Sequence, residues 1–161
     1  MEPIQRGGVD GAGSAAFPGC ALLDGPCPKA NSKGSAVMAY FSGDELWVNM
    51  LKNQDHYLAG AKGNFTAYLW DAQGNKKFIG STPDSAAPSL TQYRVRSPDV
   101  LKNAQPGNYT VQTIYYTNNP QAPPAFFQCS DITVLGQNAE SLTKKHEHNH
   151  GPVTEGIMPW V

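Results

Sequence analysis

The residues of this chain best suited to chemistry are its four histidines. His56 stands alone in the first half, whereas His146, His148 and His150 alternate in a tail segment and would share one face if that segment were extended. Neutral imidazole nitrogens suit Cu, Zn and Ni. The three tail side chains are therefore candidate metal ligands. The alternatives are a solvated His-rich tail and, for His56, a loop histidine hydrogen-bonded to the backbone.

Other kinds of catalysis find little support in the sequence. It has no Gly-rich phosphate loop and no Gly-x-Ser-x-Gly elbow, and nothing places a nucleophile beside a base. The acidic pair Asp44 and Glu45 falls at a turn, where solvated carboxylates are the simpler interpretation. Conventional acid-base hydrolysis is therefore disfavoured.

Alternating apolar residues predict the strands that must position these groups. Leu46, Val48 and Met50, for example, alternate with side chains of the opposite face. Turn signals recur every 8 to 12 residues or so, and no amphipathic helical stripe is present. We therefore expect an all-β sandwich of about seven strands, with one helical turn at residues 98–102. The expected strands cover residues 37–41, 45–51, 64–71, 77–80, 90–97, 108–115 and 126–134.

The length of 161 residues fits one domain with a full core. Residues 1–35 are rich in Gly, Ala, Ser and Pro and predict an extended arm. Residues 36–135 form the β-sandwich domain, and residues 136–161 form a polar, His-rich tail. The end of this tail is apolar, with Ile157 and Trp160 among its last residues, which suggests docking onto the domain or onto a partner.

The charge pattern argues against two classes of partner. The net charge is −1, and Lys and Arg are scattered rather than gathered in a basic stripe, so nucleic acid is not an expected partner. No apolar run approaches the length of a membrane span, so no membrane is expected either.

The last predicted strand carries the most specific motif, Ala125-Phe126-Phe127-Gln128-Cys129 followed by a polar and β-branched run. It resembles the lytic polysaccharide monooxygenases and their relatives, which include type-4 chitin-binding domains. That family has a small residue, an aromatic, any residue, Gln and then Cys or Ala near the end of an immunoglobulin-like β-sandwich. The resemblance implies this fold and places Phe126 on the axial side of a copper ion, where a Phe supplies no ligand.

A second segment extends the resemblance over residues 43–134. The family places a copper histidine in a loop before a glycine and an alternating strand, and His56 precedes Gly60 and the strand of residues 64–69 in the same way. The resemblance therefore implies that His56 ligates copper and that Gln128 positions an oxygen-derived species. The family's N-terminal copper histidine has no counterpart, because the chain begins with Met1 and no histidine precedes His56. The ligand set is either incomplete or completed by the tail histidines.

The resemblance implies a protein that binds copper and a polysaccharide such as chitin or cellulose. If it is an enzyme, we expect a copper-dependent polysaccharide monooxygenase or peroxygenase. One alternative is a non-catalytic carbohydrate-binding module that stacks aromatic rings on sugars. Another is a structural subunit that self-associates through its terminal arms. The candidate stacking residues are Tyr57, Tyr115, Tyr116 and Trp160.

Three cysteines are too few and too widely spaced for a zinc framework, so a disulfide is favoured. In the family, the cysteine after the last aromatic pair bridges to the N-terminal region, which implies Cys27 to Cys129 first and Cys20 to Cys129 second. A disulfide indicates an oxidising compartment, and the sequons at Asn64 and Asn108 agree with an extracellular glycoprotein. No signal peptide is visible, so the leader is either trimmed, which we favour, or never made.

Overall fold

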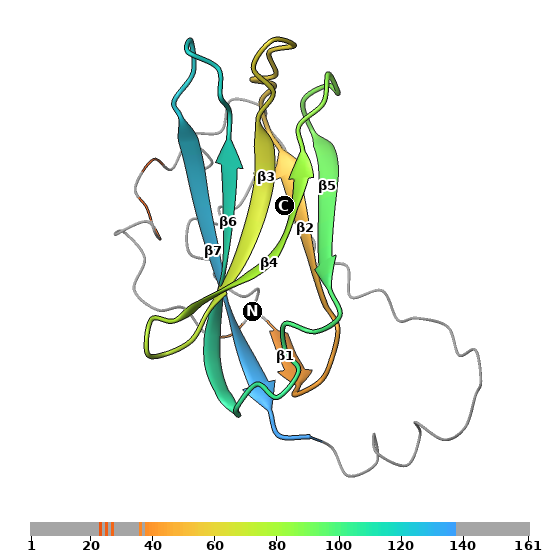
Figure 1. The fold of residues 1–161 in the computed structure, drawn as a ribbon, viewed down its shortest axis with the longest axis vertical. Helices are drawn as coiled ribbons and strands as arrows, with labels where there is room; N and C mark the ends of the chain where they lie inside the picture. Colours follow the sequence, from red (N-terminus) through yellow and green to blue (C-terminus); the bar gives the residue numbers. More distant parts are fainter. Residues whose placement is uncertain (1–22, 24, 26, 28–35, 37, 138–161) are drawn as a thin grey trace, which may run out of the picture.

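The computed structural model describes residues 23, 25, 27, 36 and 38–137. This part of the chain contains seven strands and no helix, which confirms the expected all-β class (Figure 1). The strands are β1 (Met38–Phe41), β2 (Leu46–Lys52), β3 (Asn64–Trp70), β4 (Lys76–Pro83), β5 (Thr91–Ser97), β6 (Gly107–Tyr116) and β7 (Ala125–Leu135).

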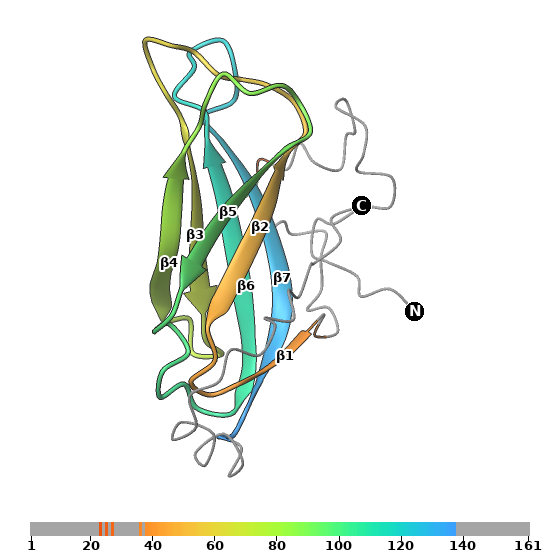
Figure 2. The same cartoon turned by 90° about the vertical axis from the view of Figure 1, so that its right-hand side faces the viewer.

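The strands form two sheets. Five strands pair in the order β1-β7-β6-β3-β4, and the other two, β2 and β5, pair with each other. All pairs are antiparallel except β1 with β7, which is parallel. Figures 1 and 2 together show the two-stranded sheet lying against one face of the five-stranded sheet. The expected sandwich is therefore present.

The core lies between the sheets and follows the alternation in the sequence. The two-stranded sheet contributes Leu46 and Val48, and the five-stranded sheet contributes Ala67, Ile132 and Val134, all at most 1% exposed. Each of these side chains is removed from water, which stabilises the fold by about 1.5–3 kcal/mol for a residue as large as Val, Leu or Ile. The period of two therefore identified the buried face correctly.

The expected helical turn at residues 98–102 is wrong. The segment forms two successive turns instead, with Lys102 N–H donating to the Asp99 carbonyl and Ala104 N–H to the Leu101 carbonyl. Asn103 adopts a left-handed φ of 60°, which asparagine tolerates and which stops a right-handed helix. The turns bury Leu101 completely, so they close one end of the core.

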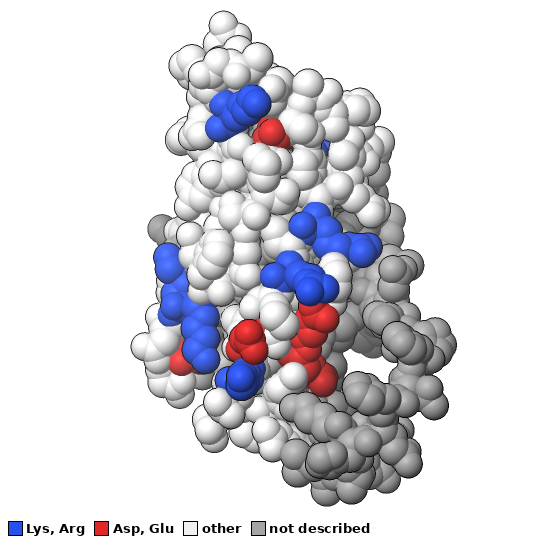
Figure 3. Space-filling model, turned by 45° about the vertical axis from the view of Figure 1, so that its right-hand side comes forward, with Lys and Arg blue, Asp and Glu red and all other residues white. Residues whose placement is uncertain are grey.

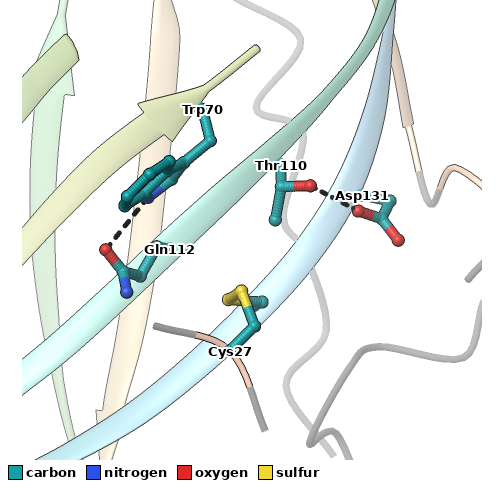
Figure 4. Close-up of a disulfide and its surroundings, with 6 residues drawn as sticks. Cys27, Trp70, Thr110, Gln112 and Asp131 are labelled. Carbon is teal, nitrogen blue, oxygen red and sulfur yellow. Dashed lines mark hydrogen bonds between the residues drawn. A yellow bond between two sulfur atoms is a disulfide. The ribbon is translucent and has the colours of Figure 1, made fainter. Parts of the chain in front are cut away.

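A disulfide attaches Cys27 to the outer face of the five-stranded sheet. Cys27 is bonded to Cys129 of β7, with a Cα–Cα distance of 5.8 Å, which confirms the pairing expected first. Figure 4 shows Cys27 near two polar pairs, in which Trp70 Nε1 donates to Gln112 at 3.0 Å and Thr110 donates to Asp131 at 2.7 Å. Other structural roles of the N-terminal arm, and of Cys20 within it, lie outside the described residues.

The described surface carries charges of both signs. On the face drawn in Figure 3, Lys and Arg lie among Asp and Glu rather than forming a single-sign field. Two ion pairs on the surface join Arg96 to Glu45 at 3.2 Å and Lys102 to Asp99 at 3.9 Å. No helix in the described part of the chain is long and apolar enough to cross a membrane.

Candidate functional site

Three loops meet at one end of the sandwich. They are residues 53–63 between β2 and β3, residues 84–90 between β4 and β5, and residues 117–124 between β6 and β7. All three lie at the upper end of Figures 1 and 2. We call this region the loop end. It brings His56 in the first loop close to Phe126 at the start of β7, although the two are far apart in sequence.

The backbone around His56 is held by neighbouring elements. The Asn119 side chain donates to the His56 carbonyl at 3.0 Å, and the His56 ring lies beside the Tyr115 ring, with the centroids 6.2 Å apart. Gly63 ends the loop, and a Cβ there would collide with the Tyr116 carbonyl, so this position requires glycine. The loop is therefore fixed against β6 and against the loop that precedes β7.

The ring of His56 lies almost parallel to the ring of Phe126. The ring centroids are 5.2 Å apart and the planes differ by 11°. Partial burial is the main cause that lowers the pKa of His56 below its ordinary value of 6.5. Its ring nitrogens make no hydrogen bond with another residue in the described part of the chain. The structure thus presents a largely neutral imidazole at neutral pH.

The other residues singled out from the sequence are placed differently. Gln128 is half-buried on the same face of β7 as Phe126, two residues further on and opposite Thr113. Tyr115 is not an exposed stacking platform, because its ring stacks on Phe65 at 4.3 Å and its hydroxyl donates to Asp84. Two of the remaining candidate stacking residues, Tyr57 and Tyr116, are half-buried, while the third, Trp160, lies outside the described residues with the tail histidines His146, His148 and His150.

The described residues do not by themselves fit a copper ion. Within residues 38–137 and the few described positions before them, no group of three or more His, Cys, Asp or Glu side chains could hold a metal. This part of the chain offers His56 as one imidazole donor beside a phenylalanine ring. Tight copper binding would need further donors from residues 1–22 or 138–161, or from others outside the described set.

Sequence reasoning missed a buried polar cluster beneath the same loops. Asp84 accepts hydrogen bonds from Lys52 Nζ at 3.0 Å, from the Tyr93 hydroxyl at 2.9 Å and from the Tyr115 hydroxyl at 2.6 Å. Lys52 Nζ also donates to Asp55 at 2.9 Å. We call these five residues the Lys52–Asp84 cluster. Because Asp55 lies in the loop that carries His56 and also accepts from the Tyr57 amide, the cluster supports that loop.

The protonation of the cluster follows from its contacts. Burial acts to lower the pKa of Lys52, but hydrogen bonds to Asp55 and Asp84 outweigh it and raise that pKa above its ordinary value. Burial, and then the hydrogen bond to Asp84, raise the pKa of Tyr115 far above its ordinary value. The tyrosine therefore keeps its proton and remains a hydrogen-bond donor.

One signal for this cluster was present in the sequence. Lys52 continues the core-facing series of Leu46, Val48 and Met50 with period two, so a buried lysine was predictable. A buried lysine requires an acidic partner. Asp84 carries no such local signal, because it simply follows the last residue of β4.

Comparisons with known proteins give a weak likeness. No protein-family model matches the sequence, and a search of curated proteins finds no match. The likeness to a solved structure described as "Structure of T.fusca AA10A" covers 60% of this chain and 52% of that structure's chain, with 13% identity and a TM-score of 0.39. The likeness to an AA10 lytic polysaccharide monooxygenase from Streptomyces lividans covers 70% of this chain and 65% of that enzyme's chain, with 14% identity and a TM-score of 0.38. This chain thus spans about half to two thirds of those structures, and its function has to be argued from the site.

Proposed function

We propose that this protein is an extracellular β-sandwich that binds a polysaccharide at its loop end and copper through His56. The observation that carries the proposal is the ring-on-ring contact of His56 with Phe126. The sequence resemblance singled out these two residues from separate segments, one as a copper ligand and the other as the axial neighbour. Their contact in the folded chain supports the resemblance over residues 43–134.

The proposed copper site needs donors beyond His56. A single imidazole beside a phenylalanine ring binds copper weakly, because such sites owe their affinity to several preorganised nitrogen donors. In this proposal the tail residues His146, His148 and His150 supply the rest. Bound copper would supply redox chemistry, and the chain's own part is to present a neutral imidazole, to cover its face with Phe126 and to place Gln128 further along β7.

Copper binding tests the role of His56. We expect copper(II) titrated into the full chain to bind in the submicromolar range with a nitrogen-rich paramagnetic resonance signal. His56→Ala should weaken binding by about 100-fold or more, because even outer partners of a metal ligand contribute 10- to 100-fold. Binding should also weaken as the pH falls through the lowered pKa of His56, since a protonated imidazole is no ligand.

A chain ending before Lys144 is the matched control for that titration. Loss of binding on truncation, with His56 intact, supports tail ligands. Tight binding that survives His56→Ala contradicts the proposed site. Weak copper binding that depends on the tail alone also contradicts the proposed site.

Polysaccharide binding is tested by sedimentation with insoluble chitin and cellulose, with and without a copper chelator. We expect Tyr57→Ala, in the loop of residues 53–63, to weaken binding about tenfold, since a stacked ring contributes about 0.5–1.5 kcal/mol beyond its buried area. Phe78→Ala is the control, because Phe78 is 59% exposed on β4 outside the three loops. Binding that persists under chelation favours a carbohydrate-binding module, and concentration-dependent assembly without sugar binding favours a structural subunit.

The Cys27–Cys129 disulfide supports the extracellular part of the proposal. Disulfides persist in oxidising compartments and are rare in a reducing cytosol.

A further inference from the structure

The Lys52–Asp84 cluster holds an amine and a carboxyl group in direct contact inside the protein. Lys52 Nζ lies 3.0 Å from Asp84 Oδ1, and both side chains are 0% exposed. Lys52 is the last residue of β2 in one sheet, and Asp84 follows the last residue of β4 in the other. The contact therefore joins the two sheets beneath the loop end.

Hydrogen-bonding side chains surround this pair on both sides. The Tyr93 hydroxyl donates to Asp84 Oδ1 at 2.9 Å and the Tyr115 hydroxyl to Oδ2 at 2.6 Å, so hydrogen-bond donors face both carboxyl oxygens. Fixed donors of this kind stabilise negative charge that develops on oxygen. Asp55 Oδ1 lies 2.9 Å from the same nitrogen and helps to hold the amine in place.

We propose that Lys52 and Asp84 condense to an intramolecular isopeptide bond. The Lys52 Nζ–Asp84 Cγ bond forms and one Asp84 Cγ–O bond breaks. The departing oxygen leaves as water with two of the three ammonium protons, and the third proton stays on the new amide nitrogen. The charges of the pair cancel in the product. No oxidant, cofactor or other reactant is needed, so folding alone supplies the conditions.

Two physical terms favour this condensation. Held contact makes the reaction unimolecular, and well-oriented groups reach effective concentrations on the order of 10⁵–10⁸ M. The product also replaces a buried ion pair, which carries a large desolvation cost, by one neutral amide. Opposing them, the ammonium is not nucleophilic until it loses a proton. The alternative is a permanent ion pair with the same contacts, and it differs from the product by one water molecule.

The intact mass of the purified, reduced and denatured full chain tests the proposal. We expect a mass lower than the sequence mass by one water molecule. Lys52→Arg should restore the full mass, because a guanidinium retains the charge but does not form this amide. A dehydrated Asp-Gly site, such as Asp24-Gly25, would also lose water, but that loss would persist in the Lys52→Arg variant.

Peptide mapping locates the bond and does not depend on the folding of any variant. Trypsin does not cleave after an acylated lysine, so residues 34–62 should appear covalently attached to residues 78–94. Full sequence mass in the wild-type protein, with a free peptide of residues 53–62, overturns the proposal. This outcome leaves the copper and polysaccharide proposal untouched, because neither depends on the bond.

Discussion

Asp84→Ala lowers the free energy of unfolding by about 3–5 kcal/mol in urea denaturation, since it removes the buried partner of Lys52 and leaves that charge in an ion pair with the more exposed Asp55. Asp84 is 3% exposed and accepts from Lys52, Tyr93 and Tyr115. Alanine leaves all three donors without this acceptor. The expected loss holds whether Lys52 and Asp84 form an ion pair or an amide, because both states require the Asp84 side chain.

Asp99→Ala is the control for that measurement. Asp99 also forms an ion pair, with Lys102 at 3.9 Å, but both side chains are more than two thirds exposed. Exposed pairs contribute little, because water screens them and two mobile side chains must be ordered. We expect no measurable change there. Equal stability of Asp84→Ala and the wild type would show that the cluster does not hold the two sheets together.

The strands could be predicted because their pattern is local. Leu46, Val48 and Met50 face the core of the folded chain as their alternation indicates, and the same holds for Ile132 and Val134 in β7. Period two decides which face of a strand is buried without any knowledge of its partners. This is why the fold class and the approximate number of strands followed from the sequence.

The contacts of the loop end could not be predicted in this way. The pairing of Lys52 with Asp84 joins strands of different sheets, and no periodicity relates the two positions. His56 and Phe126 were chosen by resemblance to a family, and only the folded chain shows that their rings meet. The prediction of a helical turn at residues 98–102 was wrong for a different reason. Asn103 adopts a left-handed backbone conformation, which residue propensities alone do not determine.

The second large effect concerns the disulfide. Cys129→Ala should lower the free energy of unfolding by about 2–4 kcal/mol, because the bond to Cys27 closes a long loop and removes conformational freedom from the unfolded chain. The two cysteines are 102 residues apart in sequence, and closing a loop of this length removes much conformational entropy from the unfolded chain. Wild-type protein with the disulfide reduced should lose a similar amount, and it controls for the cavity that alanine leaves at a residue 1% exposed.

The three cysteines also allow the two pairings raised by the sequence to be compared energetically. Cys27→Ala leaves Cys20 as a competing partner for Cys129, whereas the double variant Cys20→Ala/Cys27→Ala leaves Cys129 without one. If only the Cys27 bond stabilises the sandwich, Cys27→Ala and the double variant unfold at the same urea concentration, and Cys20→Ala matches the wild type. If Cys27→Ala is the more stable of the two, Cys20 replaces Cys27 in the variant. If reducing the wild-type protein leaves its midpoint unchanged, the N-terminal segment held by Cys27 adds nothing to the stability of the domain, contrary to what we expect.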